Sequence, residues 1–230
     1  MSSIDIEQEP VTMIAALVSL SGKIAPIAAI AVFMAPIPTI RQISATRSVG
    51  SMPLLPYSSM IANGFLWFVY GALLEEQAVI IPNTFGMLLG AIYFAVFRQH
   101  CPKLASNLPG SLHNHLQAIA MIIGTTMLIY FFLPTKSAAD LIGKAGVTIC
   151  MIMFASPLVA LKAVLDTKSA KSIPLPFTFA CLFNCALWSI FGLFQMKDFN
   201  IYFPNLVGFA CGLAQLALKL IYGDGPVLPK

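Results

Sequence analysis

Charged side chains are scarce in this sequence, and their scarcity excludes an ordinary soluble domain. Only 10% of the 230 residues are charged and 58% are hydrophobic, whereas a soluble domain carries about 25% charged residues. Long apolar stretches separated by short charged segments are typical of an integral membrane protein. This composition predicts the lipid bilayer as a partner. The net charge of +4 is small, so we expect no nucleic-acid partner.

Groups that do chemistry are also missing. No Asp or Glu lies deep inside any apolar stretch, although proton-coupled carriers typically carry such ionisable relays. Four of the five cysteines lie in apolar stretches without neighbouring metal ligands, and no nucleophile–base pair or glycine-rich phosphate loop is visible. We therefore expect no catalytic residues, metal or cofactor, and the protein is not predicted to be an enzyme. Transport, if present, is predicted to be passive.

Seven apolar stretches are long enough to cross a bilayer as helices, since about 20 residues suffice. They cover approximately residues 14–40, 54–74, 78–97, 115–133, 141–163, 174–194 and 200–221. Nine of the 13 lysines and arginines fall in one set of loops and at the C-terminal end. The positive-inside rule then places the N-terminus outside and the C-terminus in the cytosol. We expect the plasma membrane, with an intracellular membrane as the alternative.

One segment of the chain occurs twice. Residues 47–71 match residues 168–192 at a constant shift of 121, which superimposes the only two tryptophans, Trp67 and Trp188. One extra residue in the second copy raises the shift to 122, so that Pro82-Asn83 matches Pro204-Asn205. Internal repeats of this kind define architecture. Equivalent spans of the two copies are four spans apart, an even number, so both three-helix units cross the membrane in the same direction.

The repeat predicts an all-α membrane protein, in which two parallel three-helix bundles are joined by a linker helix. The predicted parts are an extracellular N-terminus, the first repeat, a loop with the linker helix, the second repeat and a cytosolic tail. Their bounds are 1–12, 13–97, 98–139 (linker span about 115–133), 140–222 and 223–230. His115, at the start of the linker span, is expected to be a solvated interface residue.

Four asparagines lie inside apolar spans, where an unpaired amide costs on the order of 2–7 kcal/mol. They are Asn63, Asn83, Asn184 and Asn205. The first and third each precede a tryptophan by four residues, which places amide and indole on one helix face. Amides bind hydroxyl groups and an indole covers the apolar face of a sugar ring, so the set predicts a site for an uncharged, polyhydroxylated ligand. The alternative is that the asparagines only hold helices together.

Prolines form a second set in the first two helices of each repeat, towards the predicted cytosolic side. They are Pro36, Pro53, Pro56, Pro157, Pro174 and Pro176. A proline inside a helix removes a hydrogen bond and kinks the helix. The kinks are either hinges that open and close the cytosolic side or static bends in the helices.

The doubled motif T-[RK]-S-x-x-S-x-P, followed by N-x-x-x-W and P-N-x-x-G, resembles the eukaryotic SWEET sugar transporters over nearly the whole chain. This resemblance implies an energy-independent, bidirectional carrier of mono- or disaccharides, working by alternating access and often forming homo-oligomers. The expected substrate belongs to the glucose, fructose or sucrose class.

The resemblance also assigns roles by position. Sugar binding is assigned to Asn83, Asn205, Trp67, Trp188, Asn63, Asn184, Val32 and Met153. A hinge of four prolines is assigned to Pro36, Pro56, Pro157 and Pro174, although the internal repeat pairs Pro174 with Pro53 instead. An outer gate is assigned to Tyr70 and Asp198.

Two other classes of protein have seven membrane helices. A PQ-loop carrier of another polar solute, such as an amino acid, is disfavoured because the sequence contains no Pro-Gln dipeptide. A seven-helix receptor shares the expected topology but lacks the parallel repeat. Both remain alternatives to a sugar carrier.

Overall fold

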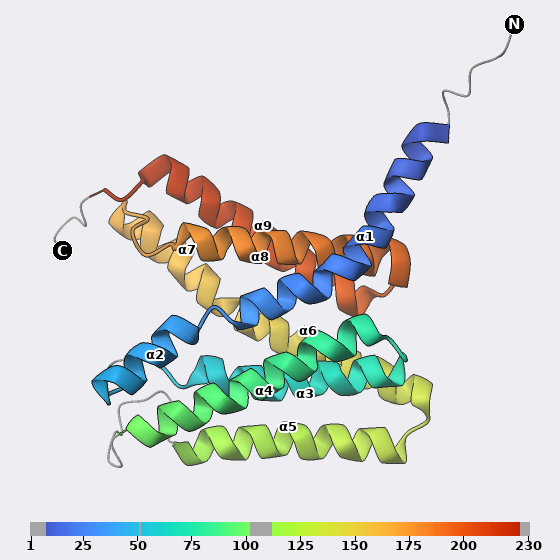
Figure 1. Ribbon diagram of the computed structural model, residues 1–230, viewed down its shortest axis with the longest axis horizontal. Helices are drawn as coiled ribbons and strands as arrows, with labels where there is room; N and C mark the ends of the chain where they lie inside the picture. Colours follow the sequence, from blue (N-terminus) through green and yellow to red (C-terminus); the bar gives the residue numbers. More distant parts are fainter. Residues whose placement is uncertain (1–7, 51, 102–111, 226–230) are drawn as a thin grey trace, which may run out of the picture. The chain divides into compact units, whose positions relative to one another are not determined.

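The computed structural model describes residues 8–50, 52–101 and 112–225, and these residues are almost entirely helical (Figure 1). The predicted N-terminal segment, the loop after the third span and the C-terminal tail therefore lie partly outside the described residues. The elements in chain order are α1 (Gln8–Phe33), α2 (Ile37–Thr46), α3 (Leu55–Leu73), α4 (Gln77–His100), α5 (Leu112–Phe132), α6 (Thr135–Met153), α7 (Ala155–Thr167), α8 (Leu175–Ile190), the π-helix η1 (Phe191–Met196) and α9 (Phe199–Tyr222).

These elements form the seven predicted spans, because three spans consist of two consecutive helices. The pairs are α1 with α2, α6 with α7, and α8 with η1. Six spans are long and apolar enough to cross a membrane by composition alone. The remaining span, α3, has 19 residues and carries polar side chains such as Asn63. The first and fifth spans reach residues 46 and 167, beyond the predicted ends at 40 and 163.

The chain divides into two compact units, which are described separately. One unit is Ala29–Ile149 and the other combines Met1–Ala28 with Cys150–Lys230. In the first unit α2 packs on α4, α4 on α3, and α3 on α5. In the second unit α7 packs on α9 and α9 on α8. Each repeat therefore has its third span between its first and second spans, and α5 is an additional helix against the first repeat. This arrangement confirms two equivalent three-helix repeats with a linker helix.

Backbone geometry repeats as closely as the sequence does. Among the described residues, four non-glycine residues have positive φ: Arg47 (51°), Lys168 (54°), Glu75 (55°) and Lys197 (52°). The first two end α2 and α7 and are 121 residues apart, whereas the other two precede α4 and α9 and are 122 apart. The sequence shift between the two repeats therefore changes from 121 to 122 residues between Lys168 and Lys197.

The π-helix η1 accommodates the extra residue of the second repeat. The backbone N–H of Glu76 donates to the carbonyl of Gly71, five residues earlier, and that of Asp198 donates to the carbonyl of Gly192, six residues earlier; both bonds are 2.9 Å long. A π-turn holds one more residue than an α-turn. Because η1 spans Phe191–Met196, the insertion widens one helical turn, and the following helix still begins at an equivalent carboxylate cap.

The linker helix α5 is fixed to the first repeat by a buried polar contact. His115 is 7% exposed, and its Nδ1 lies 2.9 Å from the hydroxyl of Ser58 on α3. The expectation that His115 is solvated is therefore wrong. Its position at the start of an apolar span did not reveal that a serine on another helix faces it.

Candidate substrate site

Asn63 and Trp67 of α3 are joined within one helical turn. The indole Nε1 of Trp67 donates a 3.1 Å hydrogen bond to Oδ1 of Asn63, which confirms that the spacing of four places both side chains on one face. Trp67 also meets the ring of Tyr70 edge-on, with centroids 5.4 Å apart. The indole is only 7% exposed, so its orientation is tightly fixed.

The equivalent pair on α8 has the same spacing but a different bonding state. Trp188 meets Phe191 edge-on at 5.7 Å and is also 7% exposed. Oδ1 of Asn184, however, is buried and has no hydrogen-bond partner. A buried acceptor without a partner costs about 1–3 kcal/mol, so it is a place where a ligand hydroxyl would be stabilising.

Asn83 of α4 and Asn205 of α9 adopt the same conformation in the two repeats. Each amide Nδ2 donates to the carbonyl four residues earlier, at 2.8 Å to Val79 and 2.7 Å to Ile201. Each follows a proline inside its helix. Because the intrahelical bond engages only one N–H, the second N–H and the carbonyl oxygen remain available to a hydroxyl ligand.

The glycine of each P-N-x-x-G motif makes room for an aromatic ring. A Cβ atom at Gly86 would lie 2.8 Å from the ring of Phe33, and one at Gly208 would lie 2.9 Å from the ring of Phe154. Phe33 ends α1 and Phe154 lies between α6 and α7, so each ring marks the break in the first helix of its repeat. The phenylalanines were not predicted as functional residues; the repeated glycine was the available signal.

Val32 and Met153 lie next to these breaks. Val32 is half-buried one residue before the end of α1, and Met153 ends α6 with 42% of its surface exposed. In the first unit, Val32 immediately precedes Phe33, and Asn83 precedes Gly86 by three residues. Both are therefore close in the chain to the contact between Phe33 and Gly86. In the second unit, Met153 and Asn205 have the equivalent relation to Phe154 and Gly208.

The prolines lie at helix beginnings and breaks. Pro36 separates α1 from α2, Pro56 is the second residue of α3, and Pro174 precedes α8. Pro157 is in the first turn of α7. Pro36 and Pro157 therefore lie at the breaks of the first and fifth spans, where the expected kinks are present, whereas Pro56 and Pro174 stand at the beginnings of α3 and α8 and interrupt no helix. The helix-interior prolines that the structure describes are Pro26, Pro82 and Pro204.

Tyr70 and Asp198, the predicted outer gate, belong to different units. Tyr70 is 3% exposed. A carboxylate oxygen of Asp198 accepts a 2.9 Å hydrogen bond from the backbone N–H of Asn200 and so caps α9. Their gating role stays a prediction.

Both repeats of the chain match a family of known proteins. A family model described as "Sugar efflux transporter for intercellular exchange" matches residues 19–105 and again residues 140–225, one match for each repeat. The chain is a member of the SWEET family.

Individual SWEET proteins are similar over most of their length. The bidirectional sugar transporter SWEET17 of Arabidopsis thaliana is 33% identical over 205 residues, covering 87% of this chain and 83% of that protein. SWEET12 of Oryza sativa subsp. japonica is 28% identical over 212 residues, covering 91% and 70%. The 3.7 Å structure of a eukaryotic SWEET transporter superposes with a TM-score of 0.82 at 23% identity, covering 93% of this chain and all of that one. This match confirms the seven-helix fold.

Proposed function

We propose that this protein is a passive, bidirectional uniporter of mono- or disaccharides. The motivating facts are its SWEET family membership and the names of its relatives, which are bidirectional sugar transporters. The proposed substrates are sugars of the glucose, fructose or sucrose class. Family membership does not support the receptor alternative or a PQ-loop carrier of amino acids.

The residues proposed to bind sugar occur as equivalent pairs in the two repeats. Asn83 and Asn205 would hydrogen-bond the hydroxyl groups, and the two indoles would cover the apolar face of the ring. The choice among sugars would be set by the side chains that shape the site, which are Asn63, Asn184, Val32 and Met153. Since both tryptophans are only 7% exposed here, stacking on a sugar requires the helices around them to move.

The single observation that carries the proposed sugar site is the unpaired amide oxygen of Asn184. Its Oδ1 is buried without a partner, whereas the equivalent oxygen of Asn63 accepts the indole N–H. If these residues only held helices together, both amides would be satisfied within the protein. An unsatisfied acceptor beside a tryptophan instead favours a ligand that supplies a hydroxyl.

Alternating access is proposed to use the breaks of the first and fifth spans. At the first break, the N–H of Ala35 donates to Val32 at 3.1 Å and that of Ile37 donates to Met34 at 3.0 Å. Such tight turns replace the α-helical pattern, so the two helix segments can reorient with little loss of bonding. Pro36 and Pro157 would act as hinges at these breaks, and Pro56 and Pro174 at the beginnings of α3 and α8. Tyr70 and Asp198 would close the outer side of the carrier.

Orientation and assembly complete the proposal. The basic loops place the N-terminus outside and the C-terminus in the cytosol, with the plasma membrane as the expected location. Assembly into homo-oligomers is expected from the resemblance to the family.

Uptake measurements test the proposal. Cells without endogenous sugar carriers would express the protein and receive labelled glucose, fructose or sucrose, with and without a protonophore. We expect one of these sugars to equilibrate along its gradient in both directions, unaffected by the protonophore. Accumulation against the gradient that the protonophore abolishes would contradict passive transport, and the absence of any sugar flux would contradict the function.

The hinge proposal has its own test. Pro36→Ala allows α1 and α2 to fuse into one continuous helix, so flux should fall while sugar binding is retained. Pro26→Ala, in the interior of α1, is the matched control. Unchanged flux in a variant combining Pro36→Ala with Pro157→Ala would leave the breaks as static features.

A further inference from the structure

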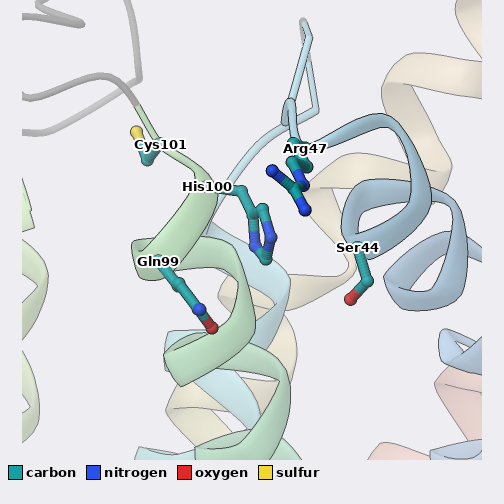
Figure 2. Close-up of a pocket in the computed structure, with 5 residues that line it drawn as sticks. All are labelled: Ser44, Arg47, Gln99, His100 and Cys101. Atoms are coloured by element: carbon teal, nitrogen blue, oxygen red, sulfur yellow. The ribbon is translucent and has the colours of Figure 1, made fainter.

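The basic end of the first repeat contains an open polar cavity of about 690 Å³ (Figure 2). It is formed by the ends of α2 and α4, and its lining residues are Ser44, Arg47, Gln99, His100 and Cys101. Figure 2 shows Arg47 and His100 approaching one another from the two helix ends. Nδ1 of His100 lies 2.9 Å from the carbonyl of Val96 and therefore donates to it. The opposite nitrogen, Nε2, remains free to bind a ligand.

The same place in the second repeat is occupied by the protein itself. Lys168, the equivalent of Arg47, lies 5.1 Å above the ring of Tyr222, the equivalent of His100, and its ammonium group is 3.4 Å from that hydroxyl. Lys219 pairs there with Asp224 and donates to the carbonyl of Ala170. The hydroxyl of Ser169 donates a 2.7 Å bond to the carbonyl of Gly225. The chain segment after α9 thus pairs a carboxylate with Lys219 and bonds to Ser169, while Lys168 itself is exposed and contacts Tyr222.

The first repeat offers no such compensation. No Asp or Glu occurs between Pro10 and Leu74, or between Gln77 and Ala139. In the portion of the chain that the structure describes, the guanidinium group of Arg47 has no ion-pair partner. Arg41 and Arg98 add further positive charge to the same helices. An anion would therefore meet an arginine, an imidazole, an amide and a hydroxyl without a competing carboxylate.

An apolar stripe along α4 leads to this cavity. Side chains at intervals of three and four residues face outward: Ile81, Phe85, Leu88 and Ile92 are 46%, 49%, 55% and 56% exposed. The same spacing continues through Ala95 to Gln99 at the cavity, and both are exposed. In a membrane this stripe faces acyl chains, and the cavity then lies where lipid headgroups are found.

We propose that the cavity binds the phosphate-bearing headgroup of an anionic membrane lipid, whose acyl chains lie along the exposed stripe of α4. Arg47 binds the phosphate, Gln99 and the imidazolium form of His100 donate hydrogen bonds to it, and Ser44 contacts the headgroup from α2. Basic cavities between membrane helices recognise phosphorylated headgroups in this way. With the orientation proposed above, the site faces the cytosolic leaflet.

Binding to purified full-length protein tests this assignment without a transport assay. The probe is a fluorescent short-chain phosphatidylinositol phosphate, titrated into monodisperse protein in neutral detergent. The expected result is saturable binding that weakens about five-fold or more in Arg47→Gln, since each basic group near anionic lipid contributes about 1 kcal/mol. The equivalent change in the second repeat, Lys168→Gln, should leave binding unchanged.

A repeat-exchange variant keeps the proposal falsifiable if Arg47→Gln is unstable. The double change Arg47→Lys with His100→Tyr installs the pair that contacts itself in the second repeat, so the lysine should engage the tyrosine and probe binding should weaken about five-fold or more while the melting temperature is maintained. Wild-type affinity in Arg47→Gln or in the exchange variant would overturn the proposal. Equal affinity for soluble inositol phosphate and for the lipid would overturn the assignment to a membrane lipid, and phosphatidylcholine should not compete.

Discussion

The two repeats share a framework and differ in what completes each of them. Both have broken first helices, paired positive-φ caps and an asparagine that bonds to its own helix. The first repeat has a bonded Asn63, an additional helix held by His115 and an open basic cavity. The second has an Asn184 whose amide oxygen is unpaired, a π-turn and a basic end at which the following chain segment bonds to Lys219 and Ser169.

The features that both repeats share stabilise a three-helix bundle. The differences lie where a repeat contacts the linker helix or the chain segment after α9, or where it is proposed to bind a ligand. Helix breaks and their glycine–phenylalanine contacts are local to one bundle, so duplication preserves them. Bonds to the linker helix or to the chain end involve segments that occur once. A difference between equivalent residues therefore marks either a ligand or a neighbouring segment, and the following variants separate these causes.

The largest effect is expected from the asparagines of the third helices. Asn83→Ala and Asn205→Ala should each weaken sugar affinity about ten-fold and nearly abolish flux, since an unpaired ligand hydroxyl costs about 1–3 kcal/mol. Equal losses would mean that the repeats contribute equally. Sugar binding to purified variants measures this effect.

Thr84→Ala is the matched control, because Thr84 also bonds to a carbonyl of its own helix, at 2.9 Å to Ile80. Its affinity should be unchanged. Full affinity in both asparagine variants would show that the sugar binds elsewhere.

Equivalent glycines should respond alike. Gly86→Ala and Gly208→Ala place a Cβ within 2.9 Å of a phenylalanine ring, and such overpacking destabilises by about 1–3 kcal/mol. We expect lower melting temperatures for both. Gly124→Ala on α5, with open space around it, should melt like the wild type. A loss in only one repeat would show that the two breaks are packed with different tightness.

The asparagines before the tryptophans should separate stability from binding. Asn63→Ala leaves the buried Trp67 N–H without its partner and should cost about 1–2 kcal/mol of stability. Asn184→Ala removes an oxygen that has no partner, so stability should be kept while sugar affinity falls. Thermal melting measures the stability of each variant, and sugar titration measures its sugar affinity. Destabilisation of Asn184→Ala with normal affinity would favour a purely structural role.

The smallest effect concerns the linker helix. Removing Ser58, His115 or both by alanine substitution gives a double-mutant cycle for their 2.9 Å contact. We expect a coupling energy of about 0.5–1.5 kcal/mol from denaturation of the purified protein. The spatially unrelated pair Ser58 and Thr148 should show no coupling. A coupling near zero for Ser58 and His115 would mean that apolar packing alone fixes α5.

The sequence by itself determined the membrane class, the seven spans, the repeat and the family. Span length depends only on local apolar content, and a repeat is visible whenever both copies retain their motifs. The bond between Asn63 and Trp67 was also predictable, because residues four apart on a helix are neighbours.

Only the tertiary structure decided which side chains meet across helices. It showed that an extra residue forms a π-turn, that Pro56 and Pro174 begin helices rather than interrupt them, and that His115 is buried against Ser58. It also distinguished the cavity at Arg47 from the equivalent end of the second repeat, where Lys168 contacts Tyr222. Each of these outcomes depends on partners 50 or so residues away or on how a turn closes, and such contacts leave no periodic signal in the chain.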